Sequence, residues 1–301
     1  MSSHRAIAAL GILLASAGAG GATEIAAVMS SGIEPYAVAY ESFVEACPAN
    51  HWVTDLSETD IPDDRILRDI LRKKPDLIVA IGSRAFQAAR EATDRVPIVF
   101  LMVLERSADP RASNVAGASI RIDPEDEMEY ASLLFPELRR IGVIYDPENS
   151  AHVVEEAARA AKARGLELVG REASSIAGTF QAMRDMEGEV DGWWMIPDRT
   201  TLTPETAEYL IVDCLRRGAP LIAPAKKYVE QGAHIALVPE YAGIGRTGAA
   251  VALQILAGRR PAEIGTVYAG EFRVVVNERT SREAGVSIGG VLASRVDYLG
   301  R

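Results

Sequence analysis

Short, dense runs of apolar residues alternate along this chain with longer segments in which apolar residues recur at helical spacing. The runs lack polar–apolar alternation, which is typical of parallel strands buried on both faces. The predicted strands are Glu24–Met29, Leu77–Ile81, Pro97–Val103, Ile141–Tyr145, Val190–Ile196, Ala219–Ala223 and Ile235–Val238. The predicted helices are Glu34–Ala46, Pro62–Lys73, Arg84–Ala92, Asp126–Phe135, Ala151–Ala163, Ile176–Glu187, Pro204–Arg217 and Gly243–Ala257. This repetition predicts doubly wound α/β layers.

The strand–helix series runs twice, over about residues 24–118 and 119–239. Asn114–Ala118 is expected to cross between the two series, and no linker rich in Pro, Gly or Ser separates them. A chain of 301 residues suits two domains. We therefore predict two closely joined Rossmann-like lobes. Their boundaries are expected to be 23–118 plus 241–268 for the first lobe, and 119–240 plus 269–301 for the second.

The N-terminus has the layout of an export signal. Arg5 precedes the uncharged, mostly apolar run Ala6–Ala17, and small residues follow from Gly18 to Ala22. This pattern indicates a secretory signal peptide with cleavage after Ala19 or after Ala22. The run is shorter than the roughly 20 apolar residues that a membrane-spanning helix needs. We expect residues 1–22 to be removed and the mature protein to be periplasmic.

Charge and composition narrow the function classes. The net charge of −10 argues against a nucleic-acid partner, which would need a basic face. The four histidines are scattered, so we expect no metal site, no cofactor and no catalysis. Cys47 and Cys214 could form a disulfide in an exported protein. Because they fall on different predicted lobes, two separate buried thiols are the favoured interpretation.

A dinucleotide-binding enzyme is the main alternative from another class. Gly243–Gly248 fits the G-x-G-x-x-G spacing, but it follows a late strand and lacks an acid about 20 residues further on at a strand end. After the first strand, where the fingerprint belongs, the chain instead has Ser30–Pro35. A repressor domain is disfavoured too, because a signal peptide stands where a DNA-binding helix–turn–helix would be.

Four longer strings of residues carry a resemblance to a known family. Lys74–Ser83 reads KPDLIVAIGS and Leu134–Pro147 reads LFPELRRIGVIYDP, followed by Ala161–Leu168 and Ile255–Ile264. In this order and spacing they resemble a bacterial family of ABC-transporter substrate-binding proteins that includes tryptophan- and tyrosine-binding members. The resemblance implies the type 1 periplasmic-binding-protein fold and a small ligand held between two hinged lobes. It also implies a membrane permease and an ATPase as partners.

Two segments near the expected cleft depart from the family's pattern. The family often has Asp-Pro soon after the strand at Pro97–Val103, where this chain has Leu104–Ser107. The stretch Pro239–Arg246 differs as well. We therefore expect the fold to carry over, while the identity of the ligand stays open.

Parallel α/β sheets bind ligands beyond the carboxyl ends of their strands, where helix N-termini present free N–H groups. In the first predicted lobe this edge holds Ser30, Ser31, Tyr36, Gly82 and Ser83. In the second it holds Tyr145, Asn149, Ser150, Asp198 and Thr200, and the last strand of this series is followed by Glu240 and Tyr241. We predict these residues as the ligand site.

The predicted site combines donors for a carboxylate with acceptors for an ammonium group. Ser83 can either cap its helix or bind a ligand carboxylate, and Asn149 and Ser150 are expected to cap theirs. Asp198, which matches an Asp of the resembled family, suits an ammonium group, although a solvated acid or a partner for Arg199 is also consistent. This arrangement suits a zwitterion such as an amino acid.

The tyrosines and lysines near this edge have two possible roles each. Tyr36 and Tyr145 can form walls for the ligand, or pack in ordinary turns. Lys226 and Lys227 can pair with an anionic group, although solvated lysines are commoner. Trp193 and Trp194 are expected on opposite faces of a strand and in the core.

The sequence thus predicts a monomeric, exported solute-binding protein that delivers an amino-acid-like ligand to an ABC importer. The alternative is a periplasmic sensor that presents its closed form to a membrane receptor or kinase.

Overall fold

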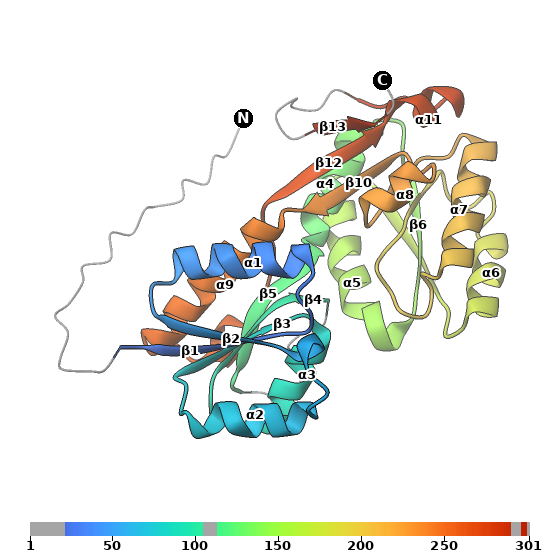
Figure 1. Ribbon diagram of the computed structural model, residues 1–301. Coiled ribbons are helices and arrows are strands. Elements are labelled where there is room, and N and C mark those ends of the chain that lie inside the picture. Colours follow the sequence, from blue (N-terminus) through green and yellow to red (C-terminus); the bar gives the residue numbers. More distant parts are fainter. Residues whose placement is uncertain (1–21, 105–112, 290–295, 300–301) are drawn as a thin grey trace.

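The computed structural model describes residues 22–104, 113–289 and 296–299. In these ranges the chain forms two lobes of sheet and helix, shown in Figure 1. Of the predicted signal peptide, residues 1–21 lie outside the described residues, as do residues 105–107 of the departing segment. Within the described ranges no helix combines the length and apolar character needed to cross a membrane.

The first lobe contains a parallel sheet in the order β11-β5-β4-β3-β1-β2. Its strands are β1 (Glu24–Met29), β2 (Asn50–Asp55), β3 (Leu77–Ile81), β4 (Ile98–Val103), β5 (Val115–Ile122) and β11 (Thr266–Ala269). One face is covered by α1 (Glu34–Ala46) and α9 (Tyr241–Leu256), which pack on each other. The other face is covered by α2 (Asp63–Arg72) and α3 (Ser83–Ala92). A 3₁₀ turn at Leu56–Glu58 and the short α10 (Pro261–Ile264) complete this lobe.

The second lobe contains a sheet in the order β13-β12-β10-β9-β8-β6-β7, in which only the pair β10–β12 is antiparallel among the described strands. Its strands are β6 (Arg140–Tyr145), β7 (Glu167–Glu172), β8 (Gly192–Trp194), β9 (Leu221–Ala223), β10 (Ile235–Pro239), β12 (Phe272–Asn277) and β13 (Val296–Leu299). Its helices are α4 (Pro124–Leu134), α5 (Pro147–Ala163), α6 (Ile176–Asp185), α7 (Pro204–Arg217), α8 (Lys226–Glu230) and α11 (Glu278–Glu283).

The central strands are buried on both faces, which explains their unbroken apolar runs. In β1, Ile25 and Ala27 belong to the core under α1 and α9, while Ala26 and Val28 belong to the core under α2 and α3. Burying each large aliphatic side chain contributes roughly 1.5–3 kcal/mol. The alternation of faces along a strand therefore places a helix layer on either side of the sheet.

Three segments join the lobes, after β5, after β10 and after β11. The segment Asn114–Ala118, expected as a crossing, lies mostly within β5, and the chain leaves the first sheet only after Ile122. β11 pairs with β5, and Glu240 N donates a hydrogen bond to Glu271 O (2.9 Å), so the three crossings lie side by side. A further hydrogen bond, from Tyr268 Oη to Glu156 Oε2 (2.5 Å), links β11 to α5 across the lobes.

The two cysteines are free thiols in different lobes. Cys47 is buried at the end of α1 and Cys214 is buried on α7. The interpretation of two separate buried thiols is therefore confirmed.

Candidate functional site

Three of the first-lobe residues predicted for the site pack together at the carboxyl ends of β1 and β3. Ser30 Oγ donates a hydrogen bond to Ile81 O (2.9 Å) and accepts one from Ala85 N (3.0 Å). Gly82 has a φ of 84°, and a Cβ atom there would lie 2.7 Å from both Ser30 Oγ and Tyr36 Cζ. Ser30, Tyr36 and Gly82 are thus brought into contact, and glycine is required between the other two.

Ser31 and Ser83 flank this group. Gly82 occupies the N-cap position of α3, and Ser83 is the first helical residue with an exposed side chain. Ser30, from the neighbouring strand, accepts the hydrogen bond from Ala85 N near the start of that helix. The alternative in which Ser83 caps its own helix is therefore wrong. Ser31, which follows β1, is half-buried.

In the second lobe the predicted residues gather around Asp198, in what we call the Asp198 cluster. Its members are Asp146, Asn149, Ser150, Asp198 and Thr200. Asp146 is the N-cap of α5, accepting a hydrogen bond from a backbone N–H of the first turn. The expectation that Asn149 and Ser150 cap this helix is wrong, because α5 begins earlier, at Pro147.

The carboxylate of Asp198 is the centre of this cluster and is only 4% exposed. It accepts five hydrogen bonds from described donors, which are Ser150 Oγ (2.7 Å), Thr200 N (2.9 Å), Asp146 N (3.1 Å), Thr201 N (3.1 Å) and Asn149 Nδ2 (3.4 Å). A carboxylate has about four lone-pair sites, so the protein itself supplies as many donors as this group accommodates. Asp198 thereby ties the loop after β8 to the start of α5.

The remaining second-lobe residues lie at the margins of this cluster. Thr200 Oγ1 donates to Asp146 Oδ2 (2.7 Å). Tyr145 is half-buried and its hydroxyl donates to Glu172 Oε1 (3.4 Å). Burial is the main cause that raises the pKa of Tyr145 above its ordinary value.

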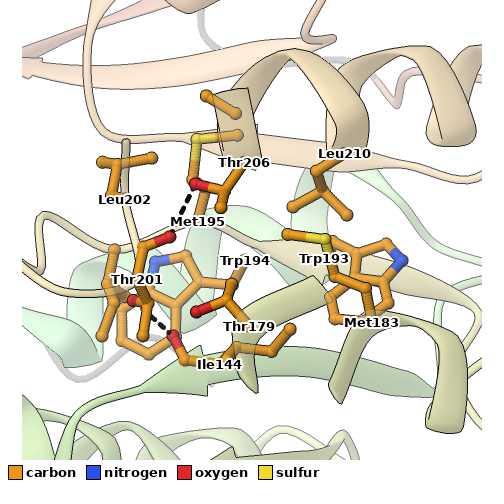
Figure 2. Close-up of a pocket in the computed structure, with 12 residues that line it drawn as sticks. Ile144, Thr179, Met183, Trp193, Trp194, Met195, Thr201, Leu202, Thr206 and Leu210 are labelled. Carbon is orange, nitrogen blue, oxygen red and sulfur yellow. Dashed lines mark hydrogen bonds between the residues drawn. The ribbon is translucent and has the colours of Figure 1, made fainter. Parts of the chain in front are cut away.

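A small cavity lies beneath the loop that carries Asp198, between β8 and α7 (Figure 2). Trp193 and Trp194 both line it, although they belong to cores on opposite faces of the sheet, as predicted. Thr201 Oγ1 donates to Ile144 O (3.2 Å) and Thr206 Oγ1 donates to Thr201 O (2.7 Å). The volume of this small cavity, about 20 Å³, suits a single water molecule. The cavity is therefore a packing defect of the core and is too small for a solute.

A much larger cavity lies beside the segments that join the lobes, and we call it the crossing cavity. Its volume is about 410 Å³. Residues Ile120–Ile122 of β5, Leu237–Pro239 of β10 and Tyr241 of α9 line it, together with Leu104 and the loops after β8 and β9. Both lobes therefore contribute to one cavity, at the carboxyl ends of their strands.

Arg121 lines this cavity and is only 6% exposed. Its Nη2 donates to Pro197 O (3.2 Å), whereas Nε and Nη1 are buried without a hydrogen-bond partner among the described residues. Burial lowers the pKa of Arg121, and the nearby Glu127 opposes this shift. An arginine stays protonated in proteins, so the cavity holds a buried positive charge with unused donors.

The backbone around Arg121 departs from regular pairing on both sides. The pairing of β5 with β4 shifts register at Met102, and the pairing with β11 shifts register next to Tyr268. Met102 has a φ of 60°, which costs a residue with a side chain about 1–3 kcal/mol. Ser119 Oγ accepts a hydrogen bond from Arg121 N (3.1 Å) within the bulged segment. Bulges of this kind re-aim side chains beside functional sites.

Glu127, on the first turns of α4, is the acidic group in this cavity and is 6% exposed. Its Oε1 accepts a hydrogen bond from Trp194 Nε1 (2.9 Å). Burial raises the pKa of Glu127 to about 7, against the opposing effects of the Trp194 hydrogen bond and the charge of Arg121.

The crossing cavity differs from the site that the sequence predicted. Among the predicted residues, Tyr241 lines it, while Glu240 precedes α9 at the N-cap position without capping it. Sequence reasoning missed Arg121 and Glu127. The available signal was a charged residue inside the otherwise apolar end of a strand, Ala116–Ile122. Two exposed lysines, Lys226 and Lys227, line the cavity. The sequence indicates them as possible partners of an anionic group.

Known proteins resemble this chain in both sequence and structure. The model of the ABC transporter substrate binding protein family matches residues 59–297. The chain belongs to this family. A tyrosine-binding protein of Clostridioides difficile (strain R20291) is 26% identical over 234 residues, which cover 74% of this chain and 67% of that protein.

Solved structures of family-like proteins share its fold. A substrate-binding protein with adhesive properties from Clostridium difficile, in its ligand-free, open form, has a TM-score of 0.68 at 21% identity, covering 92% of this chain and 99% of that one. An ABC domain from Streptococcus pneumonia in complex with L-Trp has a TM-score of 0.61 at 18% identity, with the same coverages. The predicted type 1 periplasmic-binding-protein fold, with two α/β lobes, is confirmed.

Membership of this family settles the broad function. The chain is an ABC transporter solute-binding protein, and the prediction that it is not an enzyme is confirmed because the family binds substrates. The family implies ABC transporter components as partners, and its binding proteins are typically extracytoplasmic. Across the described ranges, no group of three or more His, Cys, Asp or Glu side chains could hold a metal ion.

Proposed function

We propose that this chain is an exported binding protein that holds an amino acid or amino-acid-like solute between its lobes for an ABC importer. The crossing cavity carries the proposal. Its volume of about 410 Å³ falls within the roughly 300–1,000 Å³ of small-molecule sites. Because its lining comes from both lobes, a solute in it contacts both sheets at once and favours the closed arrangement.

The choice of an amino acid rests on two further observations. The names of two relatives refer to tyrosine binding and to a complex with L-Trp. In this chain, the cavity combines the buried cation Arg121, the buried acid Glu127 and largely apolar walls. An arginine suits a carboxylate, an acid suits an ammonium group, and apolar walls suit a side chain.

The residues predicted from the sequence remain part of the proposal as contacts at the rim. Ser31, Ser83, Asn149 and Thr200 stand at the carboxyl ends of parallel strands, where this class of sheet binds ligands. In the proposal they approach the solute when the lobes close. The lobes themselves are proposed to comprise residues 23–118 plus 241–268, and 119–240 plus 269–301, although β5 continues in the first sheet to Ile122.

Calorimetry on ligand-stripped protein tests the proposal. The mature chain is unfolded in guanidinium chloride, dialysed, refolded and titrated with the standard L-amino acids. We expect heat of binding from at least one of them, with quenching or a shift of tryptophan fluorescence, because Trp194 contacts the cavity acid Glu127. A refolded protein with native circular dichroism that binds none of them would falsify the amino-acid assignment.

Export has a separate test. The complete chain is expressed in a bacterium, and the periplasmic fraction is analysed by N-terminal sequencing. The expected mature protein begins directly after Ala22 or after Ala19. An intact N-terminus on protein retained in the cytoplasm would contradict export.

A further inference from the structure

Arg121 has hydrogen-bonding capacity that the described protein leaves unused. Its guanidinium carries five N–H donors in a rigid fork. Pro197 O accepts from Nη2, and both Nε and Nη1 are buried without a partner in the described ranges. Buried donors are normally paired, so two unpaired nitrogens on one side chain that lines a cavity point to an acceptor brought by a ligand.

The acids nearest to Arg121 are engaged elsewhere. Glu127 accepts a hydrogen bond from Trp194 Nε1, Glu156 accepts one from Tyr268 Oη, and Asp198 accepts five from its own cluster. All three attract the guanidinium through space, but none hydrogen-bonds to it in this structure. The acceptor that completes Arg121 is therefore sought in the ligand.

The chain holds Arg121 in a fixed position. β4 bulges at Met102 beside Ser119, β5 carries the extra residues where its pairing with β11 shifts register, and Ser119 Oγ accepts the hydrogen bond from Arg121 N. Pro197 O, from the loop after β8 of the second sheet, fixes the tip of the guanidinium. An arginine held at both ends is pre-organised, so binding it demands little additional ordering.

The rest of the cavity limits what can carry the acceptor. Near Arg121 the walls are apolar, with Ile120 and Ile122 from β5 and Leu237, Val238 and Tyr241 from the second crossing. At the rim, Lys227 adds positive charge, while Lys226 pairs with Glu230 (3.3 Å from Nζ to Oε1). The ligand therefore carries an anionic group at one end of an apolar body.

We propose that Arg121 binds the carboxylate of the solute and thereby selects compact carboxylates with an apolar body. This inference rests on the proposed function. A carboxylate is the planar acceptor that takes two parallel N–H bonds from one guanidinium. In this arrangement the carboxylate points toward β5, and the apolar part lies along β10 and Tyr241. Arg121 then determines specificity, while Asp198 shapes the neighbouring loop.

Three probes that differ only in their charged groups test this inference. L-tyrosine has both groups, tyramine lacks the carboxylate, and 3-(4-hydroxyphenyl)propionate lacks the ammonium group. Each is titrated into the wild-type protein and into Arg121→Gln by calorimetry. We expect the substitution to weaken 3-(4-hydroxyphenyl)propionate and L-tyrosine by about 100-fold, since a buried charge pair is lost. We expect tyramine to bind both proteins equally, within about threefold.

Two further variants separate the direct contact from general effects. Arg121→Lys keeps the charge but not the fork, so it should recover part of the lost affinity for the acid. Lys162→Gln removes an exposed charge in the last turn of α5, outside the cavity lining, and should change the affinity by less than about threefold. Circular dichroism and thermal melting confirm that each variant is folded.

The outcomes separate this inference from the proposed function. The inference is overturned if the wild-type protein ignores 3-(4-hydroxyphenyl)propionate, or if Arg121→Gln binds it as well as the wild type does. Equal losses for tyramine would also overturn it, because they would show a structural effect. If no standard amino acid binds but the propionate binds through Arg121, the amino-acid assignment fails and the carboxylate site stands.

Discussion

The Asp198 cluster and the crossing cavity meet on the loop after β8, yet they treat buried charge in opposite ways. Pro197 O accepts from Arg121, and the very next residue is Asp198. Asp198 is buried and accepts five hydrogen bonds from the protein, whereas Arg121 is buried and leaves two nitrogens without a partner. The hydrogen bonds of Asp198 hold its loop in place. The fold leaves part of the hydrogen-bonding capacity of Arg121 unused.

This difference separates two uses of a charged residue near the carboxyl end of a strand, one in each sheet. A satisfied group contributes stability, and a ligand must compete with its protein donors to reach it. An unsatisfied group contributes little or nothing to stability and is ready for a ligand. Stability and affinity should therefore respond oppositely to substitution at the two places.

The largest effect is expected from Asp198→Ala. It leaves the Ser150 hydroxyl and backbone N–H groups of a buried loop without their acceptor, so the free energy of unfolding should fall by about 3–4 kcal/mol. Urea denaturation measures it. The matched control is Asp191→Ala at the other end of β8, an exposed acid that accepts from Arg140 N, with an expected loss of about 1 kcal/mol. Equal losses at both positions would remove the distinction.

The next largest effect is a dependence of the free energy of unfolding on pH, and it comes from Glu127. Its pKa is about 7 in the folded protein against 4.5 for the ordinary group. The folded state therefore holds the proton more tightly, and this contribution to stability is complete below about pH 4.5 and is lost as the pH rises through 7. Between those limits the free energy of unfolding should fall by on the order of 3 kcal/mol in the wild type relative to Glu127→Gln.

Urea denaturation of both proteins at about pH 4.5 and pH 8 measures this difference. Burial lowers the pKa of His234 to about 4, which acts with the opposite sign, since its contribution is lost as the pH falls from 6.5 to 4. His234 is present in both proteins, so their difference isolates Glu127. Parallel pH profiles for the two proteins would contradict a buried Glu127 with a raised pKa.

Gly82→Ala tests whether the first-lobe group is as tightly completed as the Asp198 cluster. A Cβ atom would meet Ser30 Oγ and Tyr36, in addition to the strain of φ 84°, so the free energy of unfolding should fall by about 2 kcal/mol. Gly165→Ala is the control, because it has φ 74° and open space around its Cβ, with about 1 kcal/mol expected. The same loss in both variants would show that packing around Ser30 is loose.

The smallest effect on stability is expected from Arg121→Gln. Removing a buried charge with unpaired donors should leave the free energy of unfolding within about 1 kcal/mol of the wild type, or raise it. Urea denaturation of the ligand-free protein measures this. A loss as large as that of Asp198→Ala would show that Arg121 is a structural group, and the comparison between the two regions would collapse.

Much of the fold follows from local pattern. The bounds of β1 and β3 coincide with the predicted runs, because strands buried on both faces need continuous apolar sequence. The strand β2 was not predicted, since it is a polar, half-exposed edge strand. The strands β7, β11, β12 and β13 were missed as well, and β5 was expected as a crossing. β12 joins its sheet only after the chain crosses back from the first lobe.

The candidate site was predicted less completely. Topology alone placed Ser30 near Gly82, and Asn149 near Asp198, because the carboxyl ends of parallel strands share one edge. The role of Asp198 could not be predicted, since its donors come from α5 as well as from its own loop. The pairing of Arg121 could not be predicted either, since the carbonyl that accepts from its Nη2 lies 76 residues away in the chain.

The sequence by itself determined the doubled α/β series and the family, because local apolar periodicity and short strings of residues are enough to recognise them. Only the tertiary structure decided which charged groups are complete and which are open. A hydrogen bond needs its donor and acceptor within about 3 Å of each other. The partners of a buried charge are therefore set by segments that are distant in the chain and adjacent in the fold. That is why Asp198 and Arg121, both charges at the ends of strands, have opposite parts in one protein.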